Sequence, residues 1–218
     1  MHKAPVIWIN GWPGVGKNTV AECLGLLLGN DKATIVDDQY LNQTTLPPHH
    51  SHPDYEQAHS EAREAALAKF VEDRRSLSRV AIFSECQPDT PEGKAVAHEY
   101  EVAARRAGRL LIPVYLTCSV EENNRRLQTL ERKVSQRDKI RSPVEAHGVR
   151  AQGGGALFVF PGRPGLTLDV TKVAPHETAV QILTFMHDLI AQREGELAAA
   201  EATPVDGQEP DWPRLGAT

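Results

Sequence analysis

The sequence predicts a single α/β domain with three layers, in which helices cover both faces of a parallel sheet. Five short apolar segments alternate along the chain with longer segments whose apolar residues recur at helical spacing. Repeated strand–helix–strand units of this kind form parallel sheets that are buried on both faces. We find no internal repeat, so we expect one domain over residues 1–192, followed by a polar, flexible tail over residues 193–218.

The individual elements follow from apolar runs and from residues that begin or end helices. Thr90 before Pro91 is a helix cap followed by proline at the first helical position, and Ser119 forms a capping box with Glu122. The expected strands span 6–10, 33–36, 80–84, 110–117 and 166–170. The expected helices span 17–28, 54–75, 91–107 and 176–192, and another begins after Ser119.

Composition excludes several classes of protein. The 218 residues carry a net charge of -5, which argues against an extended nucleic-acid-binding surface, although a local basic cleft stays possible. No apolar run approaches the roughly 18 residues that cross a bilayer, and residues 6–9 are too short for a signal peptide. The three cysteines are scattered, so neither a disulfide framework nor a zinc site is indicated. We expect a cytoplasmic protein without a membrane partner.

A glycine-rich segment between the first strand and the first helix predicts a phosphate-binding loop. Backbone N–H groups at a helix start converge on a phosphate, and glycines let the backbone wrap closely around it. Lys17 supplies a cation for the β- and γ-phosphate oxygens of ATP or a close relative. The residues expected to hold the nucleotide are Gly11, Pro13, Gly14, Val15, Gly16, Lys17, Asn18 and Thr19.

One position departs from the common pattern, because Asn18 follows the lysine where Ser or Thr usually binds magnesium. Thr19 comes one residue later and is our expected Mg²⁺ ligand. The spacing resembles the adenylate-kinase form Gly-x-Pro-Gly-x-Gly-Lys-Gly-Thr, with Asn18 in place of the fourth glycine, and Pro13 strengthens the likeness. Over about residues 6–191 the chain resembles the small P-loop kinases. This resemblance implies a five-stranded parallel sheet ordered 2-3-1-4-5, ATP and Mg²⁺ as cofactors, and a lid near residues 125–141.

Acidic residues at two strand ends are candidates for catalysis. Phosphoryl transfer needs a carboxylate that takes the acceptor's proton, and ligands gather at the carboxyl ends of parallel strands. Asp37 and Asp38 end the second strand, where the resembled kinases place an acceptor-binding aspartate. Adjacent side chains diverge, so we expect only one of the two to face the substrate, and Asp37 is favoured. Glu85 ends the third strand and resembles a residue that orients magnesium or activates the acceptor.

The basic segment after Ser119 resembles the lid of this family, whose arginines close on the phosphates. Arg126 and Arg132 fit the spacing, and they are expected to stabilise charge during transfer.

Three functions fit these features. The first is an ATP- and magnesium-dependent kinase that phosphorylates a hydroxyl or phosphate of a small molecule. The second is a regulatory P-loop NTPase, although the Asn-Lys-x-Asp sequence of guanine-specific switches is absent. The third is a protein that binds nucleotide without catalysis, for which Asn18 is the one hint. Nothing in residues 39–55, where acceptor specificity is expected, matches a known acceptor signature.

Overall fold

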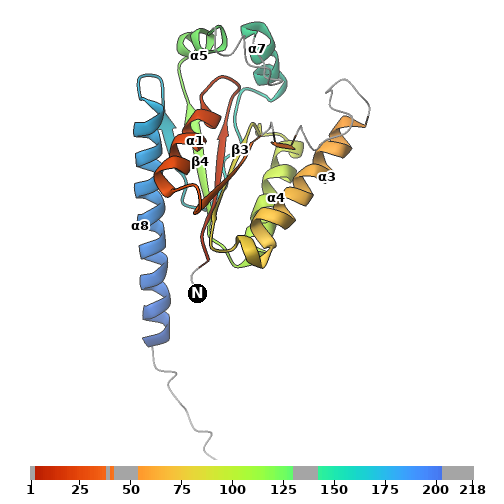
Figure 1. Ribbon diagram of the computed structural model, residues 1–218. Coiled ribbons are helices and arrows are strands. Elements are labelled where there is room, and N and C mark those ends of the chain that lie inside the picture. Colours follow the sequence, from red (N-terminus) through yellow and green to blue (C-terminus); the bar gives the residue numbers. More distant parts are fainter. Residues whose placement is uncertain (1–2, 38–39, 42–53, 130–141, 203–218) are drawn as a thin grey trace, which may run out of the picture.

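A five-stranded parallel sheet forms the centre of the molecule (Figure 1). The computed structural model describes residues 3–37, 40–41, 54–129 and 142–202. The sheet order is β2-β3-β1-β4-β5, which confirms the expected order and fold class. The strands are β1 (Val6–Gly11), β2 (Ala33–Val36), β3 (Val80–Glu85), β4 (Leu111–Thr117) and β5 (Leu166–Asp169).

Helices cover both faces of this sheet, as its apolar strands require. The helices α1 (Lys17–Leu28) and α8 (Pro175–Ala202) cover one face, and α3 (Tyr55–Leu67) and α4 (Pro91–Ala107) cover the other (Figure 1). Strand β1 is buried on both faces. Ile7 and Ile9 pack in the core under α1 and α8, and Val6 and Trp8 pack in the core under α3 and α4. Two further helices, α5 (Val120–Leu127) and α7 (Pro143–Gln152), lie beyond the carboxyl ends of the strands.

Local signals set most helix boundaries. The side chains of Thr90 and Ser119 accept backbone hydrogen bonds as N-caps of α4 and α5, which confirms both helix starts. The capping box expected at α5 is incomplete, because the Ser119 N–H donates to Thr171 and the Glu122 carboxylate accepts from Arg125 and Arg126. The expected helix over 54–75 is broken, since α3 is followed by a π-helical turn (Ala68–Glu72) and a 3₁₀ turn (Arg74–Ser76). The last helix runs ten residues past its expected end at 192, to Ala202, because the Ala- and Glu-rich sequence there favours helix.

The face under α3 and α4 contains an aromatic cluster around Trp8. Its ring lies 5.3 Å from Phe160 and 6.4 Å from Phe158, centroid to centroid, in edge-on geometry. Both phenylalanines come from the glycine-rich connection before β5. Asn10, at the end of β1, holds this connection in place, since its amide donates to the carbonyls of Gln87 and Phe158. The connection is therefore part of the core.

At the amino ends of the strands, Arg109 is 4% exposed, and its hydrogen bonds to the described residues all go to backbone carbonyls. Its guanidinium donates to the carbonyls of Ala4, Pro5, Phe70, Val71 and Arg79. Burial lowers the pKa of Arg109 to about 10. A buried charge in this setting connects the first strand to the segments before β3 and β4.

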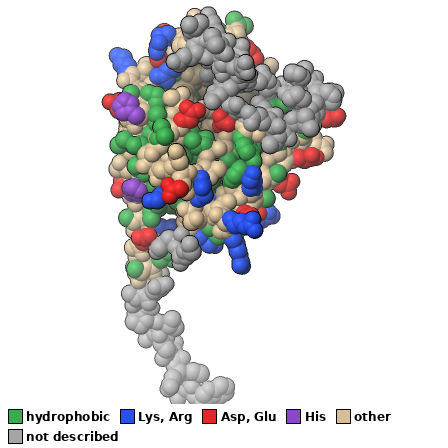
Figure 2. Space-filling view, in the orientation of Figure 1, with side chains coloured by type: hydrophobic (Ala, Val, Ile, Leu, Met, Phe, Trp, Pro, Cys, Tyr) green, Lys and Arg blue, Asp and Glu red, His purple; other side chains and the backbone are tan. Residues whose placement is uncertain are grey.

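Charged side chains are mixed on the face seen in Figure 2, where small groups of Lys and Arg alternate with Asp and Glu. Within the described part of the chain, no helix has the length and apolar character that spanning a membrane would take.

Candidate functional site

The loop between β1 and α1 has the backbone geometry of a phosphate cradle. Gly14 and Gly16 have φ angles of +88° and +108°, in the left-handed region that side-chain-bearing residues rarely adopt. A Cβ at Gly14 would lie 2.8 Å from the Asn123 amide nitrogen and 2.9 Å from Leu127 Cγ, so α5 packs directly against the loop. Because the loop leads into α1, its N–H groups converge at a helix start.

Lys17 lies at the base of this loop and is 7% exposed. Its ammonium donates to the carbonyl of Gly11 at 2.7 Å and to that of Trp12 at 3.4 Å. The cation is therefore held across the loop by carbonyl groups, with no carboxylate among these partners. A nucleotide phosphate would give it the anionic partner that these contacts lack.

Asn18 connects the start of α1 to the ends of two strands. Its amide Nδ2 donates to Asp37 Oδ2 at 2.7 Å, and its Oδ1 accepts from Ser84 Oγ at 2.9 Å. Asp37 Oδ1 also accepts from the backbone N–H of Tyr40 at 3.0 Å. The Asp37 carboxylate is thereby fixed next to the residue that follows Lys17.

Glu85 lies on the other side of the sheet from Asn18, because neighbouring strand residues point to opposite faces and Ser84 takes the Asn18 side. Glu85 is 3% exposed, and its carboxylate accepts hydrogen bonds from the Tyr100 hydroxyl and, at 2.9 Å, from the Gln87 amide. Both of its oxygens are thus occupied by protein donors. The expected role of Glu85 in orienting magnesium stays a prediction, and its carboxylate lies on the face of Tyr100, away from Asn18.

Thr19, the residue expected to bind magnesium, has different surroundings from its neighbour Asn18. Thr19 is exposed on α1, whereas Asn18 makes the contacts to Asp37 and Ser84. These three residues offer amide, carboxylate and hydroxyl oxygens, which suit Mg²⁺, a cation usually held by one or two protein groups together with phosphate oxygens and water. The residues present therefore fit this ion, and Asn18 and Asp37 would hold it. Among the residues that the structure describes, no group of three or more His, Cys, Asp or Glu could hold a metal.

Helix α5 holds the phosphate loop through three side chains. The buried Asn123 amide donates to the carbonyl of Pro13 at 2.9 Å, and Leu127 packs against Gly14. Arg126 donates to the carbonyls of Val15 at 2.7 Å and Val170 at 2.6 Å. Its remaining Nε donates to Glu122 at 2.7 Å. Hydrogen bonds from Arg125 and Arg126 lower the pKa of Glu122 to about 2.

A small cavity of about 190 Å³ adjoins the loop on the side of α7. The Arg150 guanidinium lies over the Trp12 ring, 5.5 Å from its centroid. Burial raises the pKa of the Cys118 thiol in this cavity, so the thiol is protonated at neutral pH. The lining residues are Trp12, Val15, Leu116, Thr117, Cys118 and Arg150.

Several solved structures are similar to this chain over most of its length. The Mycobacterium tuberculosis APS kinase CysC, solved with AMPPNP and APS, is 15% identical over 86% of this chain and 99% of its own, with a TM-score of 0.56. Shikimate kinase from Acinetobacter baumannii, solved with shikimate, is 16% identical over 86% and 95%, with a TM-score of 0.51. The chain has the fold of the small P-loop kinases.

Kti12 from Chaetomium thermophilum, solved with ADP-AlF3, shares this kinase fold at 16% identity over 84% of this chain and 98% of its own, with a TM-score of 0.58. No protein-family model matches the sequence, and no curated protein matches it either. Identities this low show a shared fold, so the chemistry of the site has to be argued from its residues.

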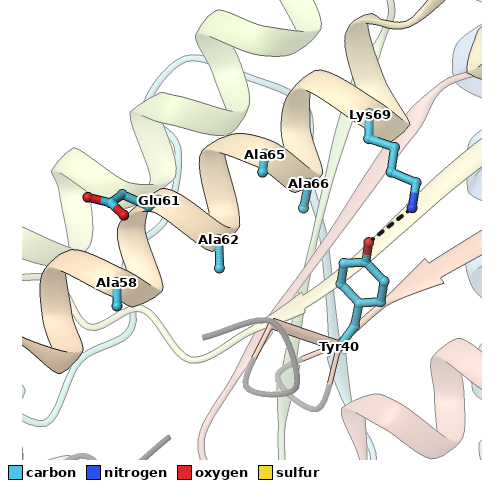
Figure 3. Close-up of a pocket in the computed structure, with 7 residues that line it drawn as sticks. All are labelled: Tyr40, Ala58, Glu61, Ala62, Ala65, Ala66 and Lys69. Atoms are coloured by element: carbon cyan, nitrogen blue, oxygen red, sulfur yellow. Dashed lines mark hydrogen bonds between the residues drawn. The ribbon is translucent and has the colours of Figure 1, made fainter. Parts of the chain in front are cut away.

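A larger cavity, of about 380 Å³, lies between Tyr40 and one face of α3 (Figure 3). Its floor is formed by the alanine side chains of α3, while Lys69 reaches across to the Tyr40 hydroxyl at 3.3 Å. Tyr40 follows Asp37 by one turn, so this cavity adjoins the strand end that carries the carboxylate. The lining residues are Tyr40, Ala58, Glu61, Ala62, Ala65, Ala66 and Lys69.

Some predicted site residues lie outside the described part of the chain, namely Asp38, Arg132 and most of the expected lid. Of the rest, the structure brings Asp37 and Asn18 together and places Arg126 against the loop. Sequence reasoning missed Asn123 and Arg150, since an asparagine and an arginine on helices show no pattern that ties them to the loop.

Proposed function

We propose that this protein transfers the γ-phosphoryl group of ATP to a hydroxyl or phosphate oxygen of a small molecule. The observation that carries the proposal is the Asp37 carboxylate, fixed by Asn18 beside the phosphate loop. An acceptor oxygen attacks the γ-phosphorus, its proton passes to Asp37, and the bond to the leaving ADP breaks. The similar structures solved with AMPPNP or ADP-AlF3, and with APS or shikimate, support a nucleotide and a small-molecule partner.

In this proposal the loop and the residues next to it have different roles. The loop amides and Lys17 bind the phosphates, and Arg126 keeps the loop in shape through the Val15 carbonyl. Asn18 and Asp37 would hold Mg²⁺, which neutralises charge on the phosphate oxygens when bound. The acceptor lies on the β2 side, where Asp37 and the cavity along α3 meet.

The test is ATP consumption by the purified protein with Mg²⁺ against a panel of nucleosides, sugars and small alcohols. One compound should stimulate consumption, and mass spectrometry should show its phosphorylated form. Lys17→Ala and Asp37→Asn should lose this transfer. The controls Lys32→Ala and Asp31→Asn, which make the same charge changes on the exposed turn before β2, should keep it. Full transfer in Lys17→Ala would refute the site.

Asn18 favours one second candidate, a protein that binds nucleotide without transfer. Its amide is already satisfied by Asp37 and Ser84, where a hydroxyl that binds magnesium is usual. Nucleotide binding without consumption, for every compound of the panel, would favour this candidate. Slow hydrolysis that no compound stimulates would instead favour a regulatory NTPase.

A further inference from the structure

The helices that cover the phosphate loop carry three described arginines, and their guanidinium groups have different partners. Arg125 donates twice to Glu122, at 2.6 Å each, and its side chain is 68% exposed. Arg126 donates to Glu122 and to two backbone carbonyls. Arg150 makes no side-chain hydrogen bond or ion pair with the part of the chain that the structure describes, and its contact is the Trp12 ring.

The partners of Arg126 give it a structural role. Its three hydrogen bonds use both terminal nitrogens and Nε, and they connect α5, the phosphate loop and the residue after β5. Turning this guanidinium toward a nucleotide would break these contacts and leave the Val15 and Val170 carbonyls without a donor. Arg126 therefore holds the loop, and a second cation for the transferred group, beside Lys17, would come from another position.

Arg150 has the position and the free donors for that task. It lies against Trp12, the second residue of the phosphate loop, and lines the cavity of about 190 Å³ together with Val15 from the same loop. A guanidinium stacked on an indole ring keeps the N–H groups of its edge available. The fork of a guanidinium matches two oxygens of a phosphate, so a half-buried arginine with no carboxylate partner among the described residues is suited to bind one.

We infer that Arg150 binds the terminal phosphate of the nucleotide, with Trp12 as the surface on which its guanidinium rests. The inference depends on the proposed nucleotide binding and adds a residue to it. It distinguishes between nucleotides, because the terminal phosphate meant here is the γ-phosphate, which ATP and AMPPNP carry and ADP lacks. Arg150 would then add to the charge of Lys17 during transfer.

The test compares the affinities of AMPPNP and ADP, each with Mg²⁺, by isothermal titration calorimetry. Arg150→Gln should bind AMPPNP roughly tenfold or more weakly than the unmodified protein, while its ADP affinity stays within about threefold. Arg150→Lys keeps a cation without the fork, so its affinity for AMPPNP should lie between those of Arg150→Gln and the unmodified protein. Arg105→Gln removes the same charge from the exposed end of α4, and should change neither affinity.

Three results would overturn the inference. Arg150→Gln could bind AMPPNP as the unmodified protein does, it could weaken both nucleotides equally, or Arg150→Lys could bind AMPPNP no better than Arg150→Gln does. Melting temperatures measured beside the titrations should be close, since Arg150 has no side-chain hydrogen bond to the described residues that could be lost. If Arg150→Gln does not fold, Arg150→Lys carries the comparison. An unmodified protein that binds neither nucleotide would refute the proposed function itself, and so is a distinguishable result.

Discussion

Replacing Asn18 with alanine removes the two hydrogen bonds that join α1 to the ends of β2 and β3. The bond to Asp37 is charge-assisted and short, 2.7 Å, and the bond from Ser84 is neutral, 2.9 Å. Hydrogen bonds to charged groups contribute about 1.5–3 kcal/mol and neutral ones about 0.5–1.5 kcal/mol. At a half-buried site, water can make some of the hydrogen bonds that the Asn18 side chain makes, which reduces the loss. We therefore expect Asn18→Ala to lower the free energy of unfolding by about 1–3 kcal/mol.

Urea unfolding measures this change, and a double-mutant cycle assigns it to the contact. Asn18→Ala and Asp37→Ala, alone and combined, should give a coupling energy of about 1 kcal/mol or more. Thr19→Ala, one residue on and exposed, should change the free energy of unfolding by less than about 0.5 kcal/mol. A coupling energy near zero would show that the Asn18–Asp37 contact does not form in solution.

The same variants separate the two candidate magnesium ligands. If Asn18 lies at the ion, Asn18→Ala reduces the gain in AMPPNP affinity that Mg²⁺ produces, and Thr19→Ala leaves that gain unchanged. The opposite pattern would refute our interpretation of the geometry and restore the ligand expected from the sequence.

Three further predictions concern the supports of the site. Gly14→Ala forces a Cβ into Asn123 and Leu127 at a φ of +88°, so it should cost about 2 kcal/mol or more and weaken nucleotide binding; an unchanged melting temperature would contradict the packing. Arg109→Met leaves five carbonyls without their donor and should lower the free energy of unfolding by about 3–5 kcal/mol, measured in urea; a loss below 1 kcal/mol would show that these bonds contribute little. The pKa of Glu122 is lowered to about 2 in the folded protein, so the stability that its ionised carboxylate contributes is present above its ordinary pKa near 4.5 and is lost as the pH falls through 2. The difference in unfolding free energy between the unmodified protein and Glu122→Gln should therefore shrink over that range of pH. A constant difference would contradict the shift.

Most of the fold could be predicted from the sequence because its signals are local. Apolar runs bounded by turns identified all five strands, and cap residues such as Thr90 and Ser119 identified helix starts. Helix α7 was missed although Ser142 and Pro143 repeat the cap and proline seen at α4. It is short, contains Gly148 and buries only Ala146 among its ten residues, so no apolar stripe marked it.

The site could be predicted less completely, because its contacts depend on the direction of side chains. The carboxylate after β2 was expected at the right strand end, and Asp37 is there. Spacing alone could not show that Asn18 points at Asp37 while Thr19 faces solvent, nor that Ser84 and not Glu85 shares the Asn18 face. These directions follow from helix rotation and strand alternation once the packing is known.

Gly153 explains why a tryptophan is tolerated inside the phosphate loop. A Cβ at Gly153 would lie 3.1 Å from the Trp12 ring and 2.6 Å from the Pro88 side chain, so three segments meet there without room for a methyl group. These segments are the phosphate loop, the residues after β3 and the end of α7. The close approach fixes the Trp12 ring beneath Arg150, at 5.5 Å from its guanidinium. Any residue larger than glycine at 153 would move α7, and with it Arg150, relative to the phosphate loop. The bulky Trp12 thus makes the geometry of the loop depend on the glycine-rich connection that precedes β5.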